Sequence, residues 1–366
     1  MNAQSKFVSR DALSEFLAEL SARFRVWAPR REGMEGAGAV MYRPFDQAAG
    51  VELDKKPTES AKRVLFPPAE ALFRFRRETD GGLSLESPPD PGPTLIFGLP
   101  PCDARGFLIF DPVYAGSGTA GRAQDTYYLR RRSKTVLIAR ACSRVLSTCF
   151  CHWVGGGPAG SEGADVLALE ADDGFVLEAV TPAGAELLEG KALRPAGDKA
   201  VKAAEQSRAS AQKNMLPAPG ISEAPEALRR RFDDAPFWRD EAAHCLSCGA
   251  CTYLCPTCYC FNMTDEGAGT SGIRLRSWDA CMAPLFTLEA SGHNPRPDKA
   301  ARLKNRIGHK FSYYPSLHGQ RFACVGCGRC IKSCPSGVDI RRVVTDALGR
   351  ETASAGAVPG KEKRHA

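Results

Sequence analysis

The 366-residue sequence lacks a long apolar segment, because no run approaches the roughly 20 residues that a helix needs to cross a bilayer. Residues 1–20 are polar and amphipathic and contain no apolar core of the kind that signal peptides carry. We therefore expect a cytoplasmic protein without a membrane span. In that reducing compartment, a count of 15 cysteines favours bound metal over a framework of disulfides.

Nucleotide-binding signatures are missing or out of place. The sequence has no Walker A lysine motif. Residues 155–160 (GGGPAG) match G-x-G-x-x-G, but the dinucleotide fingerprint needs a strand before it and a helix after it. Here the stretch follows a cysteine-containing segment and leads into a predicted hairpin, so we expect a flexible loop. With no catalytic triad or open metal site in view, we assign no catalytic residue and no nucleotide-binding residue.

The sequence does contain two cysteine runs with the same spacing, C-x2-C-x2-C-x3-C, each followed by proline. Bacterial ferredoxins hold 4Fe–4S clusters with this run, and the fourth cysteine of each run binds the other cluster. Zinc ribbons instead use separate C-x2-C pairs. We therefore predict two interleaved 4Fe–4S clusters. One is bound by Cys245, Cys248, Cys251 and Cys334, and the other by Cys324, Cys327, Cys330 and Cys255.

Four further cysteines lie near the ends of two predicted strands: Cys102, Cys142, Cys149 and Cys151. Because α/β folds place their ligands at the carboxyl edge of the sheet, these thiols are expected to meet there. Four is also the number of thiolates that an iron–sulfur cluster needs. We predict a third cluster at these residues, and the alternative is a set of buried structural thiols.

Three more cysteines flank the first run: Cys258, Cys260 and Cys281. One interpretation is a further redox-active set. The other is that they pack around the neighbouring cluster and tune it through sulfur hydrogen bonds and burial. We predict the packing role.

Periodicity predicts an α/β fold for the first part of the chain. Residues 94–99 and 135–141 are short apolar runs typical of buried strands, and residues 164–180 read as a hairpin. Thr181 and Pro182 then supply the cap and first residue of a helix. Near the N-terminus we expect Ser9 to cap a helix with the apolar face Leu13, Phe16, Leu17, Leu20 and Phe24.

Composition divides the chain into four predicted segments. They are an α/β domain (1–195) with the third cluster, a helical linker (196–235), an α-helical, ferredoxin-type dicluster domain (236–350) and a disordered tail (351–366). The dicluster domain contains a long insert, residues 256–323, and is expected to end in a helix near 340–348 that Gly349 terminates.

The formal charge of +7 does not indicate a polyanionic partner. Each cluster with its four thiolates carries about −2, so two clusters lower the net charge to about +3. No stacking platform or recognition helix accompanies the basic residues, so we expect no nucleic-acid binding. Many of them crowd the insert: Arg274, Arg276, Arg296, Lys299, Arg302, Lys304, Arg306, His309 and Lys310. They either compensate cluster charge or form a rim on which a partner docks.

Several motifs together resemble one family: residues 56–73, 98–114, 149–170, 255–261 (CPTCYCF), 278–281 (WDAC) and 324–335 (CVGCGRCIKSCP). The chain is similar to the beta subunits of cytosolic NAD(P)-linked NiFe hydrogenases (sulfhydrogenases) and to the A subunit of anaerobic sulfite reductase. It also resembles the iron–sulfur subunits of flavin oxidoreductases that feed heterodisulfide-reductase-type complexes.

The resemblance implies a non-catalytic electron-transfer subunit of a multi-subunit oxidoreductase. Its expected partners are a diaphorase-type subunit that binds FAD and NAD(P) and a catalytic redox subunit. The resemblance implies that the eight cysteines of the two runs are cluster ligands. It also includes the other seven cysteines as motif positions, but it does not imply a role for them. The alternative is a self-contained oxidoreductase that binds flavin or substrate in its N-terminal domain.

Overall fold

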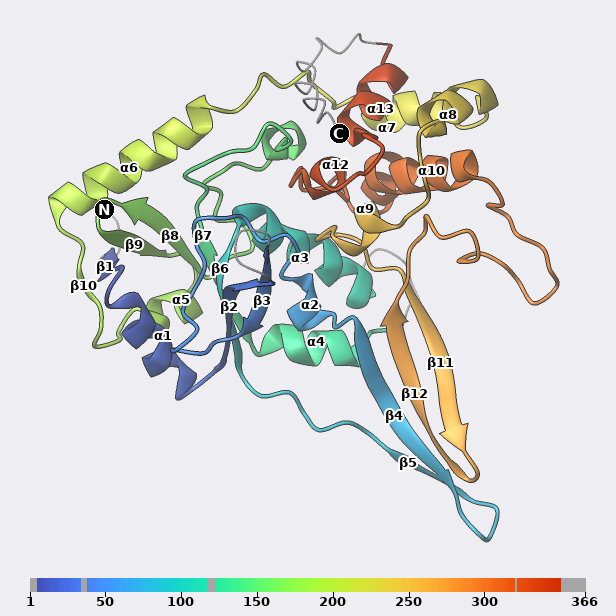
Figure 1. The fold of residues 1–366 in the computed structure, drawn as a ribbon, viewed down its shortest axis with the longest axis horizontal. Coiled ribbons are helices and arrows are strands. Elements are labelled where there is room, and N and C mark those ends of the chain that lie inside the picture. Colours follow the sequence, from blue (N-terminus) through green and yellow to red (C-terminus); the bar gives the residue numbers. More distant parts are fainter. Residues whose placement is uncertain (1–4, 34–37, 117–122, 320, 350–366) are drawn as a thin grey trace, which may run out of the picture.

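An eight-stranded mixed sheet forms the centre of the N-terminal half in the computed structural model, which describes residues 5–33, 38–116, 123–319 and 321–349. Its strand order is β10-β1-β9-β8-β7-β6-β2-β3 (Figure 1). The strands are β1 (Lys6–Ser9), β2 (Arg25–Glu32), β3 (Ala39–Pro44), β6 (Thr94–Leu99), β7 (Thr135–Arg140), β8 (Val166–Ala171), β9 (Gly174–Ala179) and β10 (Arg194–Pro195). Strands β2, β6, β7 and β8 are parallel, and the outer pairs are antiparallel. The predicted α/β fold is confirmed.

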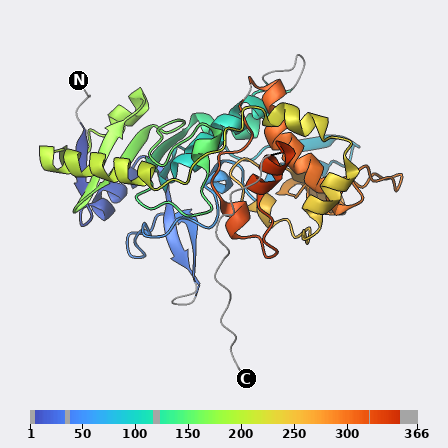
Figure 2. The ribbon, with the colours of Figure 1, turned by 90° about the horizontal axis from the view of Figure 1, so that it is seen from above.

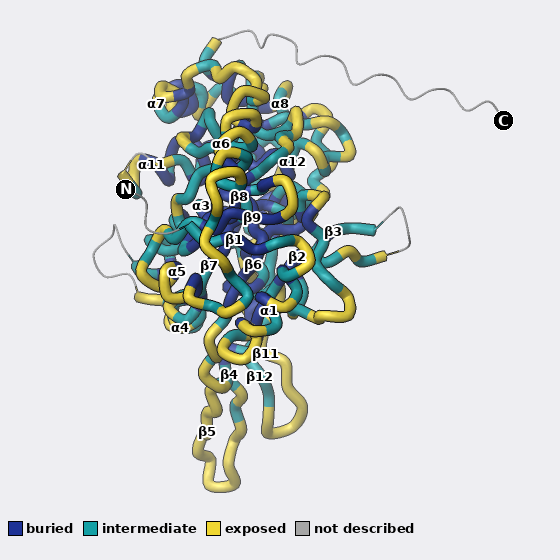
Figure 3. The backbone as a smooth tube through the Cα atoms, turned by 90° about the vertical axis from the view of Figure 1, so that its left-hand side faces the viewer, coloured by how far each residue is buried: buried dark blue, intermediate teal, exposed yellow. Residues whose placement is uncertain are grey.

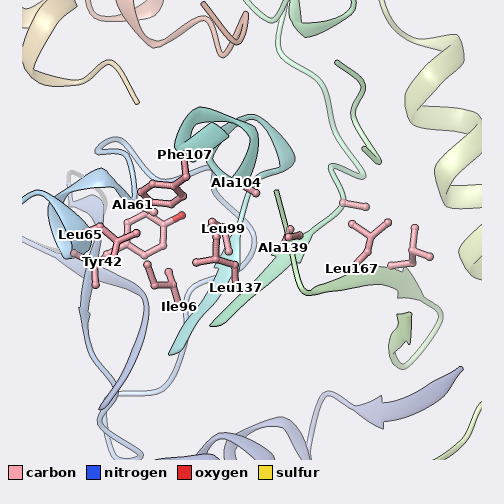
Figure 4. Packing of buried hydrophobic residues seen from close by; sticks show 14 of the residues in the cluster. Tyr42, Ala61, Leu65, Ile96, Leu99, Ala104, Phe107, Leu137, Ala139 and Leu167 are labelled. Carbon is pink, nitrogen blue, oxygen red and sulfur yellow. The ribbon is translucent and has the colours of Figure 1, made fainter. Parts of the chain in front are cut away.

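The central strands are buried on both faces because helices cover both sides of the sheet. Ile96 and Leu137 belong to the core that includes helix α3 (Pro101–Tyr114), and Figure 4 shows them with Phe107 of that helix. Leu95 and Ile138, one position away, belong to the opposite core with helix α1 (Leu13–Ser21). Each fully buried Leu, Ile or Phe contributes about 1.5–3 kcal/mol, so the alternation fixes the register of these strands.

Four more helices lie around this sheet: α2 (Lys62–Leu65), α4 (Thr126–Ser133), α5 (Pro182–Leu187) and α6 (Asp198–Lys213). Helix α6, in the predicted linker, packs along β8 and β9. The predicted hairpin is confirmed as β8–β9. The predicted cap of α5 is also confirmed, because Thr181 Oγ1 accepts a hydrogen bond from Gly184 N at 3.2 Å.

The predicted start of α1 is wrong. Ser9 ends β1, because residues 6–9 pair with β9, and the helix begins only at Leu13. The Ser9 Oγ still accepts a hydrogen bond from Ala12 N at 3.2 Å. Phe24 lies beyond the end of the helix at Ser21. Pairing with a distant strand therefore overrides the local capping signal.

A second sheet projects from the body of the molecule, and we call it the arm (Figures 1 and 3). Its order is β11-β12-β4-β5, formed by β4 (Ala69–Arg77), β5 (Leu83–Glu86), β11 (Phe261–Ala268) and β12 (Ser271–Trp278). Leu83 and Leu85 on β5 are 64% and 62% exposed. Because β11 and β12 lie in the insert, the predicted α-helical description of the C-terminal domain is incomplete.

Short helices surround the two cysteine runs, on the side of the molecule away from the N-terminus (Figure 2). They are α7 (Ala224–Arg230), α8 (Ala235–Ala242), α9 (Ala250–Tyr253), α10 (Lys299–Gly308), a π-helical turn (His309–Tyr313), α11 (Tyr314–Leu317), α12 (Arg329–Lys332) and α13 (Ile340–Ala347). Gly349 follows α13 with a φ of +68°, as predicted for its end. No helix in the described part of the chain is long and apolar enough to cross a membrane. The predicted tail, 351–366, lies outside the described residues.

Candidate iron–sulfur centres

Both cysteine runs fold in the same way. In each run the residue after the second cysteine is a glycine, Gly249 or Gly328, with a φ of +75°. Glycine adopts this left-handed conformation readily because it has no Cβ. A one-turn helix follows, α9 or α12, and carries the third cysteine of the run. The local sequence therefore builds the same cysteine loop twice.

Two cavities bring the two runs together. The first cavity is lined by Cys245, Cys248, Cys251 and Cys334. The second cavity is lined by Cys255, Cys324, Cys327 and Cys330. Each cavity contains the four cysteines of one predicted set, three from one run and the fourth from the other, and the first cavity is also lined by Cys330 of the second set. Cys330 and Arg306 line both cavities, so the two are neighbours.

Backbone amides donate to the sulfur atoms in both cavities. Val338 N donates to Cys334 Sγ at 3.2 Å, and Gly326 N donates to Cys324 Sγ at 3.4 Å. Burial acts to raise the pKa of Cys334, but hydrogen bonds from Ser336 and nearby backbone amides hold that pKa below its ordinary value. Such donors favour the thiolate, which is the form that binds metal.

Buried cations lie beside the same sulfur atoms. Arg306 on α10 is 4% exposed, and its Nη1 donates to Cys258 Sγ at 3.5 Å. Lys310, in the π-helical turn, is 2% exposed, and its Nζ donates to Cys255 Sγ at 3.4 Å. A hydrogen bond with the Cys258 thiol, followed by the charges of Lys310 and Arg306, lowers the pKa of Cys255 well below its ordinary value.

Neither of these two cations forms an ion pair with a carboxylate in the part of the chain that the structure describes. The buried Arg329 differs, because it pairs with the Asp103 carboxylate. An unpaired buried cation costs several kcal/mol, so Arg306 and Lys310 require negative charge nearby. A 4Fe–4S core with four thiolates carries about −2. The sulfur donors and the cations therefore fit an anionic cluster in each cavity.

The basic stretch of the insert thus divides into two parts. Arg306 and Lys310 point inward and support the charge-compensation interpretation. Lys299 and Lys304 instead donate to the carbonyl oxygens of Ala243 and Phe232 at the exposed surface. These outer lysines leave the docking-rim interpretation open.

The spacing of the thiols also bears on the kind of metal. Among the described residues, no group of three or more His, Cys, Asp or Glu side chains is arranged to hold a single metal ion. A cubane binds each thiolate to a different iron atom, so its ligands surround a cluster and do not gather on one ion.

The other four cysteines of the N-terminal region lie around Lys56: Cys102, Cys142, Cys149 and Cys151. Cys102 is in the first turn of α3, and Cys142 follows β7, so both are at the carboxyl edge of the parallel strands. Lys56 Nζ donates to Cys149 Sγ at 3.8 Å and to the Cys327 carbonyl oxygen at 2.7 Å. Burial raises the pKa of Cys151 to about 12, with Cys142 and Cys149 adding to the rise.

Glycines of the second run bring that run against the segment that holds Cys149 and Cys151. Phe150 N donates to the Gly326 carbonyl oxygen at 2.8 Å. A Cβ on Gly326 would lie 2.4 Å from the Phe150 carbonyl carbon, and a Cβ on Gly328 would lie 2.3 Å from the Thr148 carbonyl oxygen. Only glycine permits this approach, which places the four-cysteine set next to the second cavity.

The remaining three cysteines lie outside both cavities. Cys258 is between Cys255 and Arg306, and its predicted packing role beside a cluster stays a prediction. Cys260 and Cys281 lie against each other instead.

The predicted glycine-rich loop is confirmed as a loop. A 3₁₀ helix (Cys151–Val154) precedes it, and the next regular element in the described chain is β8, so it is not a dinucleotide-binding turn. Gly155, Gly156 and Gly157 line a pocket together with Arg105, Cys102 and Cys151. The loop therefore borders the four-cysteine set.

Two buried or partly buried lysines were not predicted as site residues. They are Lys56 and Lys62, and the latter is 3% exposed and donates to the Cys258 carbonyl oxygen at 3.0 Å. Both come from a segment distant in sequence from the cysteine runs. The sequence feature that could have identified these two lysines as site residues is their position in residues 56–73, one of the motifs that carry the family resemblance.

Comparison with known proteins agrees with this geometry. Residues 244–338 match the 4Fe–4S dicluster domain family. The chain is 30% identical over 343 residues to the sulfhydrogenase 2 subunit beta of Pyrococcus furiosus, a match that covers 91% of this chain and 95% of that protein.

Proposed function

Because the chain belongs to the family of the sulfhydrogenase beta subunits, we propose that it is the iron–sulfur electron-transfer subunit of a multi-subunit oxidoreductase. In the proposed complex it relays electrons between a subunit that binds flavin and NAD(P) and a catalytic subunit. The catalytic subunit is of hydrogenase, sulfite reductase or heterodisulfide reductase type. The chain itself then positions and tunes its clusters and makes no substrate bond.

The observation that carries this proposal is the crossed composition of the two cavities. Cys245, Cys248, Cys251 and Cys334 are the proposed ligands of one 4Fe–4S cluster, and Cys324, Cys327, Cys330 and Cys255 those of the other. When bound, such clusters supply one-electron transfer. The shared lining residues, Cys330 and Arg306, support transfer between the two sites because they make the cavities adjacent.

We extend the relay to a third cluster held by Cys102, Cys142, Cys149 and Cys151. Their arrangement around Lys56 supports it, since that lysine supplies a positive charge to the set. Cys102 also packs in one cluster of buried residues with Cys327, a proposed ligand of the second cavity. A third centre would therefore continue the electron path into the N-terminal domain.

Anaerobic affinity purification of the chain from its native cells tests the proposal. We expect a flavin-containing subunit and a catalytic redox subunit to co-purify. The chain itself should contain about 8 iron atoms for two clusters, or about 12 for three. Zinc in place of iron would overturn the assignment of the cysteine runs. A chain that purifies alone, binds flavin and oxidises NAD(P)H by itself would instead be a self-contained oxidoreductase.

A further inference from the structure

Two cysteines that line neither cavity meet where the β11–β12 hairpin joins the body. Cys260 directly precedes β11, and Cys281 is the third residue after β12. The end of the hairpin is closed by the Phe261–Trp278 pair and by a hydrogen bond from Asp279 N to the Cys260 carbonyl oxygen at 3.0 Å. The hairpin therefore brings together two thiols that are 21 residues apart in sequence.

The paired thiols lie next to the first cavity. The thiols of Cys260 and Cys281 lie against each other. Cys281 Sγ is also 4.0 Å from Thr252 Oγ1, and the same hydroxyl is 4.0 Å from Cys251 Sγ. Thr252 is buried, so a short route through one side chain joins the pair to a proposed cluster ligand.

We propose that Cys260 and Cys281 form a redox-active dithiol that exchanges an electron pair with the iron–sulfur clusters, an inference that rests on the proposed function. On oxidation the two S–H bonds break and one S–S bond forms. Two protons leave through the partly exposed Cys260. When bound, the two clusters of the dicluster domain would each accept one of the two electrons, and the reverse step would restore the thiols. The pair thus converts between one-electron and two-electron transfer.

The position of the pair argues against a role as cluster ligands. Ligands of a cubane surround a cavity, whereas these two thiols contact each other, and neither lines the first or the second cavity. A disulfide here would also link strands β11 and β12 of the arm at the point where they leave the body. Neighbouring Cys258 differs, because the thiol that it contacts is Cys255, a proposed cluster ligand, and because it also contacts Arg306.

The experiment uses the anaerobic full-length protein with its clusters, poised at a series of potentials, quenched in acid and then alkylated with N-ethylmaleimide in denaturant at neutral pH, where the thiolate reacts. Trypsin then releases residues 240–274 and residues 277–299, and the second peptide has Cys281 as its only cysteine. We expect a disulfide-linked pair of these peptides at oxidising potentials and two separate, alkylated peptides at reducing potentials. Chymotrypsin, which cleaves after Tyr259 and Phe261, assigns the link to Cys260.

Variants distinguish the dithiol from its alternatives. Cys281→Ser should take up two fewer electrons per chain than the wild type in a reductive titration, with the same iron content, because a dithiol/disulfide couple carries two electrons. The matched control Cys258→Ser should keep the linked peptide. The absence of the link at every potential, or a loss of iron in Cys281→Ser, would overturn the dithiol. EPR of the same samples reports on the clusters, so the proposed function and the dithiol can fail separately.

Discussion

Lys310 is predicted to raise the reduction potential of the cluster in the second cavity. Its Nζ is 3.4 Å from Cys255 Sγ and also donates to Thr257 Oγ1 and to the Ala323 carbonyl oxygen. The substitution Lys310→Met keeps the length of the side chain and removes its charge. Reduction adds one negative charge to the cluster, so loss of the cation makes reduction less favourable.

The size of this effect follows from Coulomb's law. If the ammonium lies about 6 Å from the centre of the added charge, an effective dielectric constant of about 20 gives about 3 kcal/mol. For one electron this free energy corresponds to about 120 mV, at 59 mV for each tenfold change in equilibrium constant. We therefore expect the potential of one cluster to fall by about 100 mV.

An EPR-monitored redox titration of the anaerobic protein measures the shift. The matched control is Lys304→Met, on the preceding turns of the helix, because the Lys304 ammonium donates to the Phe232 carbonyl oxygen at the surface. That control should leave both potentials unchanged within about 20 mV, since solvent screens an exposed charge. A Lys310→Met protein with full iron content and unchanged potentials would refute the charge-compensation argument.

Three further outcomes are expected. Cys334→Ser should abolish or alter the EPR signal of the cluster in the first cavity and spare that of the second; damage to the second cluster instead would mean that the runs are independent modules. Cys149→Ser should lower the iron content by about four atoms while the signals of the dicluster domain persist, and an unchanged iron count would make its set structural. Burial and the neighbouring Asp346 carboxylate raise the pKa of Glu241 to about 7. The folded state therefore holds this proton more tightly than the unfolded chain. This contribution to stability is complete below about pH 4.5 and is lost as the pH rises through 7. Because Glu241 is partly solvated, we expect about 1 kcal/mol between pH 6 and 8 in denaturant titrations, and Glu241→Gln should remove that part of the pH dependence; an identical pH profile in the variant would contradict the assignment.

Local signals predicted the elements whose stability depends on near neighbours in sequence. The strands at residues 94–99 and 135–140 and the β8–β9 hairpin have strong apolar patterns, and the structure contains them. The hairpin in the insert was missed because every residue of β11 is exposed, so its sequence shows no buried face. Its pairing with β4, nearly 200 residues earlier, leaves no local trace either.

By itself the sequence determined the two cysteine loops, because their spacing and their left-handed glycines act within a few residues. It also indicated the crossed sets of cysteines, through the x3 step and the proline of each run. Only the tertiary structure decided which charges surround those cysteines: Lys310 of the insert donates to Cys255 Sγ, and Lys62, from a segment far earlier in the chain, donates to the carbonyl oxygen of the neighbouring Cys258. It alone also paired Cys260 with Cys281. Such contacts depend on how distant segments pack, because burial and electrostatic compensation arise between elements and not within them.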